Sequence, residues 1–124
     1  MEISADDVSN EPFMKKSEAK ENKHTSYARR APPKWTKKIP VFVRAMAKSE
    51  SLLLAAGASD RFDETDPFAL YEGTSKGTLL VLSPEDGKTL HSVQLSSQPV
   101  FDGIAVGRDL ILISLMDGNV ICLR

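Results

Sequence analysis

Four carboxylates that could bind a metal ion stand close together near the middle of the chain. They are Asp60, Asp63, Glu64 and Asp66. Ca²⁺ requires clustered oxygen ligands, so this segment is the candidate metal site and calcium is the candidate ion. The spacing differs from that of an EF-hand loop, and Arg61 lies inside the cluster. A solvated acidic loop is therefore the favoured interpretation, and a calcium site is the alternative.

The remaining reactive side chains are isolated in the sequence. His91 lies within an expected strand, and a zinc site needs several His or Cys ligands, so a structural role is expected. Cys122 lies among aliphatic residues and is expected to be a small buried hydrophobic residue, since no base is placed beside it. No phosphate-binding loop and no nucleophile elbow occurs. The sequence therefore predicts no catalytic and no cofactor-binding residue.

Basic residues gather just before residue 39, beside Tyr27 and Trp35, and they are Arg29, Arg30, Lys34, Lys37 and Lys38. Residues 1–38 carry nine basic and six acidic residues, and residues 39–124 carry seven basic and eleven acidic ones. Neither part has the positive charge of a dedicated nucleic-acid binder, so no nucleic-acid partner is predicted.

A change in composition at residue 38 divides the chain into two regions. Apolar residues are sparse before it, which predicts a charged, largely disordered arm or linker over residues 1–38. At most a weak helix is possible between residues 11 and 23, because its apolar face would be too thin to pack firmly. Residues 39–124 are the expected folding unit. No apolar run reaches the roughly 18 residues of a membrane span, so no membrane insertion is expected. The first 30 residues contain no apolar region typical of a secretory signal.

The folding unit reads as short apolar runs separated by turn residues. Seven strands are expected, over residues 41–47, 51–56, 78–82, 88–95, 100–106, 110–115 and 119–123. Turn signals separate most of them, and no convincing helix lies between them. This pattern is typical of an all-β, antiparallel meander, and the continuous apolar runs indicate strands that are buried on both faces.

The chain also contains an internal repeat. Pro40-Val41-Phe42 recurs 59 positions later as Pro99-Val100-Phe101, a register that matches Ala47 with Val106. Residues 77–82 recur 41 positions later as residues 118–123. The shorter period, 41 positions, is that of a four-stranded propeller blade. The two periods differ by 18 residues, which predicts an insertion of that length between the second and third strands of the first unit. One complete blade and three strands of a second, about one and three-quarter blades, are predicted.

Residues 77–90, with their Gly-x-Leu strand, tight turn and Gly-Lys-x-Leu ending, resemble the repeat of pyrroloquinoline-quinone-like (PQQ-like) β-propellers. Residues 98–123 are similar to the closing segment of large bacterial proteins of this type. The resemblance implies a C-terminal fragment of such a protein, located in the periplasm or cell envelope. The family includes quinone-dependent alcohol dehydrogenases and non-enzymatic scaffolds.

Two departures from the enzyme pattern decide the expected function. His91 stands where the repeat carries its docking tryptophan, and no adjacent cysteine pair is present to face a quinone. We therefore expect a non-catalytic structural or protein-interaction scaffold that binds no PQQ. The alternative is a C-terminal fragment of a PQQ-dependent dehydrogenase-like protein. The expected partners are the remaining blades of a parent propeller, a second copy of the chain, or another protein.

Overall fold

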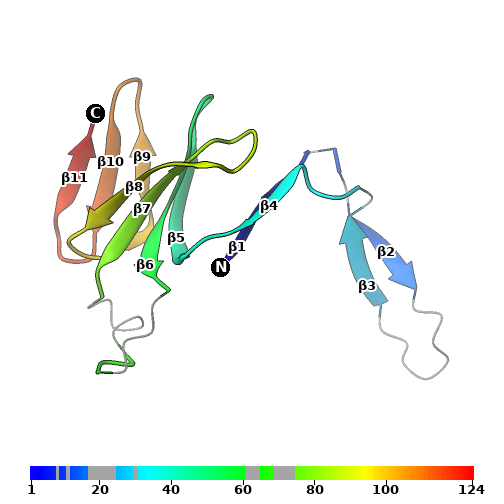
Figure 1. The fold of residues 1–124 in the computed structure, drawn as a ribbon, viewed down its shortest axis with the longest axis horizontal. Helices are drawn as coiled ribbons and strands as arrows, with labels where there is room; N and C mark the ends of the chain where they lie inside the picture. Colours follow the sequence, from blue (N-terminus) through cyan, green and yellow to red (C-terminus); the bar gives the residue numbers. More distant parts are fainter. Residues whose placement is uncertain (8, 11, 17–24, 30, 61–64, 69–74) are drawn as a thin grey trace.

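A computed structural model describes the chain apart from residues 8, 11, 17–24, 30, 61–64 and 69–74 (Figure 1). For residues 12–16 and 25–29 it describes the backbone alone. Every regular element in this part of the chain is a β-strand, and every ladder is antiparallel. The all-β, antiparallel prediction is therefore confirmed. The described residues contain no helix that could cross a membrane.

The folding unit forms two antiparallel meanders, which Figure 1 shows side by side. The first meander is a four-stranded sheet in chain order, made of β5 (Val41–Lys48), β6 (Leu53–Ser59), β7 (Gly77–Leu82) and β8 (Thr89–Leu95). The second meander is a three-stranded sheet of β9 (Pro99–Val106), β10 (Ile111–Leu115) and β11 (Val120–Leu123). All seven predicted strands are present, in groups of four and three as the repeat predicted.

The predicted turns connect these strands. Residues 49–52 and 107–110 each form a turn that is closed by a backbone hydrogen bond of 2.8 Å between its first and last residue. Gly87 and Gly118 have φ angles of 73° and 87°, which glycine adopts without the steric cost of a β-carbon. Short turns of this kind make each strand pair with its neighbour in sequence, and so produce meanders.

The N-terminal region contains strands where a largely disordered arm was expected. β1 (Glu2–Ala5) pairs with β4 (Trp35–Lys38), and β2 (Pro12–Lys16) pairs with β3 (Thr25–Arg29) in a hairpin that Figure 1 shows apart from the other sheets. Residues 12–16, where at most a weak helix was predicted, form β2 instead. An apolar stripe this thin gives a helix little surface to pack on, so a helix gains little stability from packing here.

The two central strands of the first meander, β6 and β7, are buried on both faces. One face packs on the second meander, in a cluster built around Leu54, Ala56, Leu79, Val81, Leu95, Ile113 and Leu115. The other face carries Ile39, Val41, Ala55, Leu80 and Leu82, and Ile3 of β1 packs against it. Alternate residues of β6 and β7 thus enter different clusters, as the period of a strand requires. The predicted burial of continuous apolar runs on both faces is confirmed for these two strands.

The structural repeat is shifted by one residue from the repeat seen in the sequence. Leu54 pairs with Val81 across β6 and β7, and Leu112 pairs with Cys122, which lies 41 positions after Val81. Leu54 therefore corresponds to Leu112, 58 positions later rather than 59. The turns at residues 49–52 and 107–110 repeat at the same 58 positions. Ala47, the partner of Leu54, likewise corresponds to Ala105 and not to Val106.

The ladder between β9 and β10 is irregular ahead of this register. Ile113 pairs with Ile104 but Leu115 pairs with Pro99, so β9 bulges between Pro99 and Ile104. A shift of one residue exchanges the two faces of a strand, so the corrected register decides which faces correspond.

With this register the two meanders stack the same way round, which means that their corresponding faces point in the same direction. The face of the second meander that packs on the first carries Ile111, Ile113, Ile121 and Leu123. These residues correspond to Leu53, Ala55, Leu80 and Leu82, which lie on the face of the first meander that is turned away from the second. Consecutive sheets are therefore related as successive members of a stack, not as the two mirrored halves of a sandwich.

Candidate interaction surface

The acidic cluster lies in the connection between β6 and β7. Asp60 follows β6 directly, and its backbone N–H donates to the Pro40 carbonyl at 3.2 Å. Asp66 is exposed, whereas Asp63 and Glu64 lie outside the described residues. Within the described ranges, no three His, Cys, Asp or Glu side chains are grouped so that they could hold a metal ion. The solvated loop stays the prediction, and the calcium alternative is not tested by the described residues.

The two isolated reactive side chains both lie on the surface. His91 lies in β8 and pairs with Val81 of β7, and its side chain is exposed. Cys122 is also exposed, so the expectation of a buried hydrophobic residue is wrong. The reason is strand alternation: Ile121 and Leu123 are turned toward the first meander, which turns Cys122 outward.

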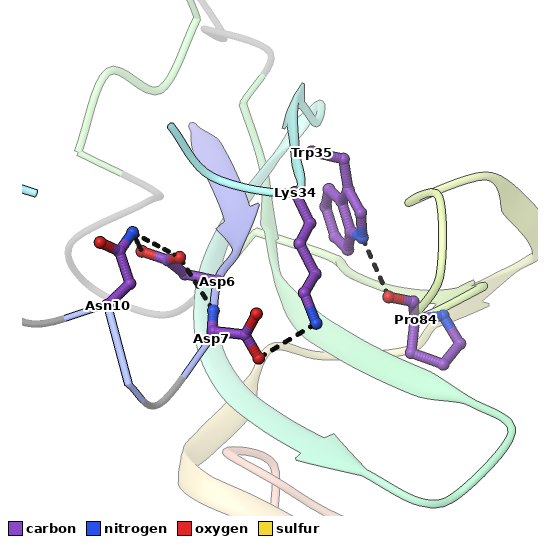
Figure 2. A network of polar contacts seen from close by, with 6 residues as sticks. All are labelled: Asp6, Asp7, Asn10, Lys34, Trp35 and Pro84. Atoms are coloured by element: carbon purple, nitrogen blue, oxygen red, sulfur yellow. Dashed lines mark hydrogen bonds and ion pairs between the residues drawn. The ribbon is translucent and has the colours of Figure 1, made fainter. Parts of the chain in front are cut away.

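A tryptophan joins the N-terminal ladder to the first meander. The Trp35 indole lies against Gly87, in the turn between β7 and β8, and a β-carbon at Gly87 would be 2.7 Å from Cε3 of the ring. The indole Nε1 donates to the Pro84 carbonyl at 2.9 Å, as Figure 2 shows. Lys37 reinforces this contact, because its Nζ donates to the Gly87 carbonyl and to Thr89 Oγ1. These contacts were not predicted, and the presence of a single tryptophan is their only trace in the sequence.

Polar contacts join the two ends of the segment that connects β1 to β4. Asn10 donates through Nδ2 to Asp6 and to the Ala31 carbonyl, and its Oδ1 accepts the Ala31 N–H. Lys34 forms an ion pair of 3.2 Å with Asp7 (Figure 2). Lys34 and Lys37, which belong to the basic group considered in the sequence, thus contact groups within this chain.

Gln98 joins the two meanders. It lies in the connection from β8 to β9 and is fully buried. Its Oε1 accepts a hydrogen bond of 2.8 Å from Arg44 of β5, its Nε2 donates to Ser75, and its carbonyl accepts the Met116 N–H. One side chain therefore contacts the first strand of one sheet, and its backbone contacts the last turn of the other. Its role was not predicted, because nothing in the sequence distinguishes it from an exposed glutamine.

The far side of the second meander carries uncharged side chains that face solvent. We call it the outer face, and it consists of Ala105, Leu112, Ser114, Val120 and Cys122. Leu112 is 40% exposed and Val120 is 64% exposed. Apolar residues clustered on one exposed sheet face are typical of an interaction surface. In the described part of the chain, no strand pairs with the outer edge of β11.

A second surface feature lies on the opposite side of the molecule. An open groove of about 440 Å³ crosses the first meander, lined by Pro40, Ser59, Thr78, Leu80, Ser92 and Gln94. Ser92 and Gln94 lie on the face of β8 opposite to Val93 and Leu95, because side chains alternate along a strand. The lining offers neutral hydroxyl and amide groups.

Two exposed turn aspartates have lowered pKa values for the same reason. The Lys88 backbone N–H donates to Asp86 Oδ1 at 2.9 Å, and this bond lowers the pKa of Asp86. The Asn119 N–H does the same for Asp117, also at 2.9 Å, and lowers its pKa. A hydrogen bond to the charged form stabilises that form. Both carboxylates therefore close turns and show no sign of acid–base chemistry.

Compared with known protein families, with curated proteins and with solved structures, the chain has no match. The geometry of its own residues is what assigns it a class: an all-β protein with two antiparallel meanders stacked the same way round.

Proposed function

We propose that this chain is a non-catalytic scaffold of stacked β-sheet repeats of the propeller type, and that it acts by packing against other proteins. One observation carries the proposal: the two meanders are stacked the same way round, with the corresponding face of each turned toward the preceding layer. Such stacking is open-ended, as in repeat proteins, in which each unit contacts only its neighbours.

The connections between layers support the same interpretation. The chain passes from β4 into β5 and from β8 into β9, each time from the last strand of one sheet to the first strand of the next. Trp35 of the N-terminal ladder lies against the turn between β7 and β8 and so joins two layers. The docking tryptophan of the PQQ-like repeats, which residues 77–90 resemble, likewise joins neighbouring blades. The β1–β4 ladder would then be the outer part of a preceding unit.

The stack is tested by asking whether its layers unfold together. Trp35 is the only tryptophan and reports the docking of the N-terminal ladder on the first meander. We expect its fluorescence, far-ultraviolet circular dichroism and the hydrogen exchange of β6 and β10 to give one urea transition. Separate transitions would show that the layers are independent and would overturn the proposal.

The absence of catalysis needs a separate test. Titration of the full chain with PQQ and CaCl₂, followed by the absorbance of the quinone, is expected to show no saturable binding. Stoichiometric binding, together with dye reduction in the presence of an alcohol, would replace the scaffold by the dehydrogenase alternative.

A further inference from the structure

The outer face corresponds, residue by residue, to a face that is buried elsewhere in the same chain. Leu112 corresponds to Leu54, and Val120 and Cys122 correspond to Leu79 and Val81. Leu54 and Leu79 are almost inaccessible to solvent because the second meander covers them. The fold therefore contains one covered and one uncovered copy of the same type of face.

The covering layer must be uncharged. The sheet that covers Leu54 and Leu79 does so with Ile111, Ile113 and Ile121, which are aliphatic. Among the five residues of the outer face, the Cys122 thiol is the only ionisable group, and Arg124 follows at the end of β11. A charged layer laid on it would have to lose its hydration without gaining a partner, which is costly.

Head-to-tail stacking of two copies would not provide such a layer. At the other end of the stack, the side of the β1–β4 ladder turned away from the first meander presents Glu2, Ser4, Thr36 and Lys38. These residues are exposed and polar, and two of them are charged. An outer face laid against a second outer face, by contrast, brings apolar residues together without like charges.

We infer that two copies of this chain associate through their outer faces about a twofold axis, with Leu112 and Val120 at the contact. An isologous contact of this kind closes on itself and stops at the dimer. The inference rests on the proposed stacking scaffold, since it uses the correspondence between the two meanders. It adds the partner, a second copy of the chain, and the surface that the partner covers.

The first test is the mass of the full chain in solution, measured by size-exclusion chromatography with light scattering over a range of concentrations. We expect a dimer, and we expect Leu112→Glu to weaken dimerisation by about a hundredfold or more, because the glutamate would lie unpaired in an apolar contact. Leu90→Glu is the matched control, since Leu90 is similarly exposed at 46% but lies on β8. It should leave the dimer unchanged.

A second variant and a cross-link keep the test decisive. If Leu112→Glu loses its circular dichroism spectrum, Val120→Glu replaces it, because Val120 lies on an edge strand and is more exposed. A short bismaleimide should join two copies through Cys122, the only cysteine, and Leu112→Glu should suppress this cross-link.

Three results would overturn the inference: a monomeric wild type, an open series of oligomers, or equal effects of the Leu112 and Leu90 substitutions. A monomer that still unfolds in one transition would refute the dimer and leave the proposed scaffold standing. Separate unfolding transitions would refute the scaffold itself.

Discussion

The Trp35 ring packs against the backbone of Gly87, so close that a β-carbon on Gly87 would be 2.7 Å from the ring. Gly87 thus serves two purposes. Its φ of 73° closes the turn between β7 and β8, and its missing side chain makes room for the indole of the neighbouring layer. A single position therefore connects the local turn to the packing between layers.

Replacement of Gly87 by alanine is expected to destabilise the protein more than the same change at Gly118. Both glycines have positive φ, which costs an alanine about 1 kcal/mol. Only Gly87 has a neighbour in the way, because nothing lies within 4 Å of a β-carbon at Gly118. We expect an additional loss of about 1–3 kcal/mol for Gly87→Ala from displacement of Trp35, measured by urea unfolding. Equal losses in the two variants would mean that the contact contributes nothing.

Gln98→Ala is expected to reduce the free energy of unfolding by about 1–3 kcal/mol, since it removes a buried side chain and leaves two partly buried polar groups without their partner. The Arg44 guanidinium would lose its 2.8 Å hydrogen bond, and Ser75 would lose its donor. Gln94→Ala removes the same kind of side chain from the exposed surface of β8 and should cost less than about 0.5 kcal/mol. If the two substitutions had the same effect on urea unfolding, Gln98 would not be joining the meanders.

The strands and turns of the meanders could be predicted because their signals are local. Apolar runs bounded by turn residues marked all seven strands, and the glycine in each of the turns 83–87 and 117–118 has the φ its position requires. The register between the two units is not a local property. From Pro99 to Ile104, β9 advances five residues while β10 advances two, and Asp102 within this bulge has a φ of 53°. Gly103 is a sequence signal for a bulge, but it does not give the length of the bulge.

The surface features were harder to predict than the core. Cys122 lies in an aliphatic run, so the sequence does not show which face of β11 packs on the first meander. Ile121 and Leu123 lie on the packed face, and Cys122 lies on the exposed one. That choice follows from the stacking of the two sheets, which depends on contacts between residues far apart in the sequence. The contacts of Trp35 and Gln98 have the same origin, since each reaches a partner roughly 50 residues away.

The turn carboxylates predict how stability depends on pH. The pKa values of Asp86 and Asp117 are lowered in the folded protein by the Lys88 and Asn119 backbone N–H groups. The unfolded chain therefore binds protons at a higher pH than the folded chain. Their contribution is fully present above the pKa of an unperturbed aspartate, about 3.9, and is lost as the pH falls toward their lowered values.

We accordingly expect the Asp86→Asn, Asp117→Asn double variant to be less stable than the wild type at pH 7, with a difference that narrows below about pH 4. Urea unfolding at several pH values measures this. Asp109→Asn, in the turn at residues 107–110, is the control for the loss of an exposed carboxylate. A difference that widened on acidification would contradict the assigned role of the two hydrogen bonds.

Gly57 marks the closest approach between two strands of the first meander. A β-carbon there would lie 1.8 Å from the Phe42 carbonyl oxygen and 2.6 Å from its carbon, so the clash is with backbone and no rotamer relieves it. Gly57 pairs with Val43, where the register of β5 shifts. We expect Gly57→Ala to cost at least about 3 kcal/mol, because β5 must move away from β6. Gly107→Ala is the control, since its nearest neighbour is Leu110 at 3.9 Å, an ordinary contact. Urea unfolding that showed similar stability for both variants would mean that β5 yields easily, and that the start of the first meander is not held by its pairing with β6.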